Sequence, residues 1–250
     1  MKIVFAGVVP KELTIPESNE DKFSFSHDGR RLALCDGASE SFDSKLWAEV
    51  LSTLFVDDPK VGSDWVAIAL RSYSAVYDHG TMSWSKQAAF ERGSFATLLG
   101  VEEDSTHNSV EILAVGDSVA LLISGGELVQ SWPYSDPECF KQRPNLLATV
   151  NTHNNFVGQS GFWTEHGKTF DLEGLDNPIL LCMTDALGEW ALRQTLPGGE
   201  GLSELLSVSS EDELITLVER ERAAKRMRVD DSTLIVLSFV RESEDGLPLT

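Results

Sequence analysis

The sequence predicts an α+β protein, a sandwich of mostly antiparallel sheets, and three observations support this fold class. Short apolar runs bounded by turn residues recur along the chain, which is typical of strands. Stretches with helical spacing lie between some of these runs, yet the two kinds do not alternate one for one as in a doubly wound parallel sheet. Gly125-Gly126 separates two alternating runs by the two residues of a tight hairpin, so these neighbours should be antiparallel.

The expected strands, in chain order, are residues 3–9, 31–35, 95–101, 110–115, 119–124, 127–132, 178–183 and 233–240. Apolar stripes with helical spacing occupy residues 46–55 and 65–76, and both helices should cover one face of a sheet. A third helix begins at the capping box Ser210-Glu211-Asp212-Glu213. We expect it to continue to the basic residues of 225–228, whose charges would complement the helix dipole.

The 250 residues, 42% of them hydrophobic, are enough for one domain with a full core, and we assign it to residues 1–240. Residues 131–176 have little periodicity and are rich in Pro, Asn, His and Gly, which predicts a long irregular excursion of the kind that often lies near a functional site. The polar residues 241–250 are expected to form a flexible tail.

Charge and cysteine content limit the partners and the compartment. A net charge of -20 would repel nucleic acid and anionic lipid, so neither nucleic acid nor membrane is expected as a partner. The chain has three cysteines without metal-ligand spacing, which fits a reducing, cytoplasmic setting. We expect Cys35 and Cys182 to be buried thiols.

The five histidines have no metal-ligand spacing and are expected at the surface; they are His27, His79, His107, His153 and His166. The alternative is that His153 or His166 contacts a substrate.

Aspartates stand at the ends of several predicted strands. Asp36, Asp117 and Asp185 each follow an apolar run, and Asp230 comes just before one. If that last strand is antiparallel to its neighbours, all four reach the same sheet edge. Carboxylates gathered there would repel one another unless a cation neutralises them, and oxygen ligands favour Mg²⁺ or Mn²⁺. For any single aspartate the alternative is that its side chain only starts a turn.

Six short motifs follow one another along the chain. They are Asn19-Glu20-Asp21, Cys35-Asp36-Gly37-Ala38, Gly93-Ser94-Phe95-Ala96-Thr97, Gly116-Asp117-Ser118, Thr184-Asp185-Ala186 and Asp230-Asp231-Ser232-Thr233. In this order they resemble the motifs of the PP2C-type (PPM) metal-dependent Ser/Thr protein phosphatases of the bacterial, single-domain kind. The resemblance extends over nearly the whole chain.

The resemblance implies a four-layer α-β-β-α sandwich with two Mn²⁺ or Mg²⁺ ions at one end. Asp36 would bridge both ions, the carbonyl of Gly37 would join one, and Asp185 and Asp230 would complete the other. Glu20 and Asp21 would act directly or through waters, and Asp117 would lie behind the ligands. Asp36, Asp185 and Asp230 would thereby support attack on phosphorus by a water held between the ions.

The function implied is hydrolysis of phosphoserine or phosphothreonine in proteins, with a phosphorylated kinase or kinase target as the partner. Two alternatives stay open: a pseudophosphatase that serves as a binding or regulatory module, and a hydrolase of small phosphoesters.

The sequence departs from the family at three places. The family's phosphate-binding arginine is replaced by Pro16, so that Lys11 or Arg143 would have to substitute. No histidine follows Asp36-Gly37, and Ala186 stands where the family has glycine.

Overall fold

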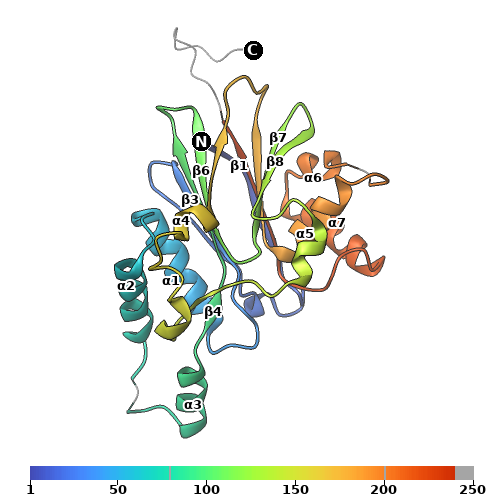
Figure 1. The fold of residues 1–250 in the computed structure, drawn as a ribbon. Helices are drawn as coiled ribbons and strands as arrows, with labels where there is room; N and C mark the ends of the chain where they lie inside the picture. The colour runs from blue at the N-terminus through green and yellow to red at the C-terminus, as the bar shows by residue number, and fades with distance from the viewer. Residues whose placement is uncertain (79, 200, 240–250) are drawn as a thin grey trace.

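The computed structural model describes residues 1–78, 80–199 and 201–239, which fold into four layers (Figure 1). Two antiparallel sheets pack face to face, and helices cover the outer face of each. This α-β-β-α sandwich is the fold class that the sequence predicts.

Among the described residues, each main sheet has five strands, all paired antiparallel. The first sheet has the order β1 (Lys2–Val9), β12 (Ser232–Ser238), β11 (Ile179–Met183), β7 (Val119–Ser124) and β8 (Glu127–Trp132). The second has the order β10 (Gly167–Asp171), β6 (Ser109–Val115), β5 (Leu98–Asp104), β3 (Arg31–Cys35) and β2 (Lys22–Phe25). The short strands β4 (Phe95–Ala96) and β9 (Leu147–Ala148) pair beside them.

The helices divide between the two outer layers and the connecting segments (Figure 1). They are α1 (Ser44–Asp57), α2 (Ser63–Ser74), α3 (Trp84–Arg92), α4 (Phe162–His166), α5 (Asp185–Gln194), α6 (Ser203–Ser207) and α7 (Glu211–Ala223). Single 3-10 turns lie at Pro16–Ser18, Pro137–Lys141 and Asn151–Asn154. Within the described ranges, none of the helices has the length and apolarity needed to cross a bilayer.

Strand β3 shows how alternation builds the sandwich, because successive side chains of a strand point to opposite faces. Leu32 and Leu34 pack between the two sheets, whereas Ala33 and Cys35 face the layer of α1 and α2. On the other side, α5, α6 and α7 cover the outer face of the first sheet. Both faces of each sheet are therefore buried, and the strand ends are left as the open edge of the sandwich.

The predicted hairpin is confirmed: Ser124 pairs with Glu127, and Gly125 and Gly126 take φ angles of 59° and 83°. Both angles lie in the left-handed region that such a turn requires and that glycine adopts without steric cost.

The run 95–101 is interrupted rather than continuous. At the break, the backbone amide of Thr97 donates to the carbonyl of Asp36, which detaches β4 from β5. Strand β4 then pairs with β9 and with Gly37 instead of extending the sheet.

The segment 131–176 holds more structure than its composition indicates, including β9, α4 and β10. Strand β10 pairs with β6 at an edge of the second sheet and buries only Phe170 fully, so its sequence carries almost no apolar alternation. The predicted tail 241–250 and the last residue of run 233–240 lie outside the described residues.

Helix α7 ends at Ala223, so the prediction that it continues into the basic residues is wrong. Lys225 takes a φ of 57°, which a helix cannot accommodate, and turns the chain toward β12. Arg226 pairs with Glu221 and Arg228 with Asp185 instead of complementing the helix dipole.

Two further expectations are corrected. The apolar stripe predicted over residues 65–76, which included Ile68 and Val76, is only partly buried. Those two residues are exposed, and the buried residues of α2 are Trp65, Val66, Ala69 and Tyr73. His166 is buried and its Nδ1 lies 3.0 Å from the carbonyl oxygen of Ala114. The helices α3, α4, α5 and α6 were not predicted.

Candidate metal centre

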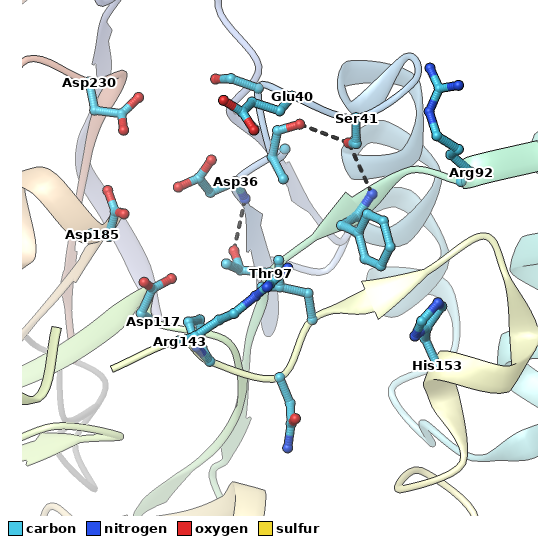
Figure 2. A pocket seen from close by; sticks show the side chains of 18 residues that line it. Asp36, Glu40, Ser41, Arg92, Thr97, Asp117, Arg143, His153, Asp185 and Asp230 are labelled. Atoms are coloured by element: carbon cyan, nitrogen blue, oxygen red, sulfur yellow. Dashed lines mark hydrogen bonds between the residues drawn. The ribbon is translucent and has the colours of Figure 1, made fainter. Parts of the chain in front are cut away.

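Four aspartates from different elements line a single cavity of about 910 Å³ at the open edge of the sandwich (Figure 2). Asp36 follows β3, Asp117 connects β6 to β7, Asp185 begins α5 directly after β11, and Asp230 precedes β12. Because β11 and β12 are antiparallel, with Met183 opposite Leu234, the end of one strand and the start of the other meet here. The convergence expected of the four strand-terminal acids is therefore present.

Burial and mutual repulsion disfavour ionisation of these carboxyl groups. The pKa of Asp36 lies well above its ordinary value, because the group is buried and because Asp21, Asp185, Asp230 and Asp117 surround it with negative charge. Burial also raises the pKa of Asp185 to about 7, with the nearby charge of Arg228 acting in the opposite direction. Ionising all of these carboxyl groups would therefore concentrate negative charge that a cation would relieve.

Asp21 does not line the cavity but lies buried behind it. Its Oδ2 accepts hydrogen bonds from the hydroxyl groups of Thr184, at 3.0 Å, and Thr233, at 2.6 Å, while Oδ1 is buried without a partner. Burial raises the pKa of Asp21 to about 8. Glu20 also lies outside the cavity lining, and its carboxylate binds Lys11 at 2.8 Å and accepts a hydrogen bond from Ser44 at 2.5 Å.

The donor atoms fit a hard divalent cation. They are carboxylate oxygens and the backbone carbonyl of Gly37, and the buried Oδ1 atoms of Asp185 and Asp21 have no hydrogen-bond partner. In residues 1–78, 80–199 and 201–239, however, no three His, Cys, Asp or Glu side chains lie close enough together to form a ready-made ligand set. The donor atoms of the site therefore fit Mg²⁺ or Mn²⁺. The acids line one cavity, but as placed they do not surround a single ion.

Solved structures of phosphatases share this fold over nearly the full chain. The photosystem II phosphatase PBCP matches with a TM-score of 0.56 at 16% identity, covering 95% of this chain and 98% of that one. The catalytic domain of the serine/threonine protein phosphatase PstP, solved with two manganese ions, matches with a TM-score of 0.56 at 18% identity over 94% and 97%. Stp1 of Staphylococcus aureus, a serine/threonine phosphatase, matches with a TM-score of 0.52 at 15% identity over 96% of each chain.

The chain has the PP2C-type phosphatase fold. The sequence itself matches no family model and no curated protein. Identities of 15% to 18% show the fold of these phosphatases and leave this chain's activity to be argued from its own residues.

The cavity lining also has basic residues. Arg92 and Arg143 line it together with Ser39, Glu40, Ser41 and His153. Of the two residues considered as replacements for the arginine missing at Pro16, Arg143 lies at the cavity. Lys11 does not line it, because its ammonium group is held by Glu20 and by Ser39, at 2.7 Å.

Two residues near the carboxylate cluster were not singled out from the sequence. Arg228 forms an ion pair with Asp185, and its Nε lies 4.0 Å from Glu189. Asp231 accepts hydrogen bonds from the backbone amides of Lys11, at 2.7 Å, and Glu20, at 2.9 Å. Neither position has a signal of its own: Arg228 lies in a basic run, and Asp231 adjoins the more conspicuous Asp230.

Proposed function

We propose that this chain is a metal-dependent phosphatase that hydrolyses phosphoserine or phosphothreonine in proteins, in a cytoplasmic setting. The observation that carries the proposal is the gathering of Asp36, Asp117, Asp185 and Asp230 around one cavity. Their crowding makes negative charge unfavourable without a cation, and the phosphatase fold supports a role in phosphoester chemistry.

In this proposal Asp36, the carbonyl of Gly37, Asp185 and Asp230 hold two Mn²⁺ or Mg²⁺ ions. Bound divalent cations would supply the charge that activates a water molecule and offsets charge on the phosphoryl oxygens. Glu20 and Asp21 act from behind these ligands, where Thr184 and Thr233 hold the carboxylate of Asp21 in one orientation. Asp117 adds negative charge to the cluster without being assigned as a ligand.

The basic residues of the cavity lining support binding of the substrate phosphate. Arg143 is exposed at the cavity and takes the place of the missing arginine in this proposal, because a guanidinium group can donate two parallel hydrogen bonds to a phosphate. Arg92, on the same lining, can contact an acidic residue beside the phosphorylated one. The partner would be a phosphorylated protein, such as a kinase or the target of a kinase.

The test is hydrolysis of p-nitrophenyl phosphate and of a phosphothreonine peptide, each with Mn²⁺ and with EDTA. We expect turnover that requires Mn²⁺ and that Asp36→Asn and Asp185→Asn abolish. The matched control Asp57→Asn changes an exposed aspartate at the end of α1 and should leave the rate unchanged. Turnover that persists in EDTA would contradict the proposal, and hydrolysis of p-nitrophenyl phosphate alone would favour a small phosphoester as the substrate.

A second candidate is a pseudophosphatase that keeps the fold as a binding module. It is favoured by the ion pair between Arg228 and Asp185, which engages a proposed ligand, and by Pro16 in place of the arginine. Calorimetry with Mn²⁺ separates the two: a pseudophosphatase with a lost centre releases no binding heat and turns over neither substrate.

A further inference from the structure

Arg228 is built into the carboxylate cluster from a firmly held segment. The segment between α7 and β12 is anchored by Met227, which is buried in the core under α5 and α7. On its other side, the buried guanidinium of Arg222 donates to the backbone carbonyl of Asp230. The backbone of Arg228 is thus fixed between two anchors, beside the first turn of α5.

The guanidinium of Arg228 contacts Asp185, which is the first residue of α5 and also lines the cavity. Its Nη2 pairs with Oδ2 of Asp185, and its Nε lies 4.0 Å from Oε2 of Glu189, one helical turn further along. The side chain of Asp185 is 12% exposed, whereas that of Arg228 is 39% exposed. The arginine therefore pairs with a buried acid while part of its own side chain reaches solvent, so it can leave the acid by rotating into water.

We propose that Arg228 is a resident counter-ion that competes with a divalent cation for Asp185 and thereby lowers the cation affinity of this centre. The inference rests on the proposed metal centre. An Asp185 carboxylate that binds Arg228 with Oδ2 has to give up that ion pair before the same oxygen can bind a cation.

The partial exposure of Arg228 makes this competition modest. Partly exposed ion pairs are weak because solvent screens them, so loss of the pair should change cation affinity by about threefold to tenfold. After displacement the guanidinium keeps Glu189 within reach, which limits the cost of its release.

The experiment is isothermal titration of the full chain with MnCl₂, after dialysis against EDTA and then against buffer. We expect Arg228→Gln to bind Mn²⁺ about threefold to tenfold more tightly than wild type. Lys225→Gln is the matched control, because it removes the same charge from the same segment, where the described residues give Lys225 no ion-pair partner. It should bind like wild type.

Arg228→Lys keeps the positive charge and should have an affinity between those of wild type and Arg228→Gln. The increase in melting temperature on adding Mn²⁺ is a second readout, and it should follow the same order. If Arg228→Gln does not fold, a Mn²⁺ affinity of Arg228→Lys equal to or below that of wild type overturns the inference.

The outcomes separate this inference from the proposed function. Equal Mn²⁺ affinity of wild type and Arg228→Gln would overturn the role of Arg228 and leave the metal centre standing. Binding by Arg228→Gln but not by wild type would support the inference in its strongest form. Absence of binding in both would overturn the metal centre and, with it, the competition.

Discussion

The backbone amide of Asp36 donates a hydrogen bond of 2.9 Å to the side-chain oxygen of Thr97 (Figure 2). The backbone amide of Thr97 in turn donates to the carbonyl of Asp36, also at 2.9 Å. This reciprocal pair holds the end of β3 against the start of β5, so the orientation of the central aspartate depends on a residue 61 positions further along the chain.

Thr97→Val should therefore destabilise the protein and weaken cation binding. Valine has the shape of threonine but leaves the amide of Asp36 without its acceptor, which costs about 1–3 kcal/mol for a buried group. Urea unfolding and Mn²⁺ calorimetry measure the two effects. Thr216→Val, at an exposed position of α7, is the control with the same chemical change and should have little effect. Wild-type stability of Thr97→Val would show that the hydrogen bond is dispensable.

The central acid itself should oppose stability when no cation is bound. Asp36→Asn removes a carboxyl group whose pKa burial and neighbouring aspartates raise well above the ordinary value. We expect the variant in EDTA at pH 8 to be more stable than wild type by at least ~1 kcal/mol, the free energy of about one pKa unit. Added Mn²⁺ should raise the melting temperature of wild type but not of the variant.

Asp57→Asn serves as the control, because the same substitution at an exposed position should leave both melting temperatures as in wild type. If Asp36→Asn in EDTA melts below wild type, the carboxyl group stabilises the fold and the argument from crowded charge is wrong.

Much of the fold and the four central acids could be predicted from the sequence, because both follow from local patterns. Short apolar runs in β3, β6, β7, β11 and β12 identify buried strands, and each of the four aspartates lies at the end of such a run. The antiparallel order then brings them to one edge. Helix α5 was missed because Gly188 is a poor helix former and weakens the helical pattern. The structure needs glycine at this position, since a Cβ there would lie 2.6 Å from a methyl carbon of Val119.

The rest of the site depends on long-range packing that no local pattern reports. Arg228 meets Asp185 across 43 positions because Lys225 reverses the chain, and a basic run at a helix end predicts only dipole complementation. The place of Arg143 on the cavity follows from the path of segment 131–176, which lacks periodicity. Asp21 lies buried behind the cavity, where Thr184, just before α5, and Thr233 of β12 bind its carboxylate. Its action on the ions, directly or through waters, stays a prediction.

Asp231 is expected to stabilise the segment that carries Glu20. Its carboxylate, 3% exposed, accepts hydrogen bonds from the backbone amides of Lys11 and Glu20 and so closes the loop between them. Asp231→Ala should cost about 1.5–3 kcal/mol, the usual contribution of hydrogen bonds to a charged group. Urea unfolding measures the loss. Asp28→Ala is the control, because it removes a comparable hydrogen bond from the amide of Arg30 in an exposed turn, and it should cost much less stability. Equal losses of stability in the two variants would contradict the role assigned to Asp231.

The acid stability of the protein should depend on Glu221 of α7. This carboxylate, 2% exposed, accepts hydrogen bonds from Arg226 at 2.7 Å, Arg220 at 2.9 Å and Trp190 at 2.9 Å. The hydrogen bond from Arg226 is the largest cause that lowers its pKa to about 2, against the opposing effect of burial. A lowered folded-state pKa means that the stabilisation is present above the unfolded-state pKa, near 4.5, and is lost as the pH falls toward 2.

Glu221→Gln should thus be less stable than wild type by about 3 kcal/mol at pH 7, and more than half of this difference should be gone by about pH 3. Urea unfolding of both proteins between pH 7 and pH 3 measures the change. Glu127→Gln, in the exposed hairpin between β7 and β8, should follow wild type throughout. A difference between Glu221→Gln and wild type that stays constant across this range would mean that the ionised form of Glu221 is not what the three donors stabilise.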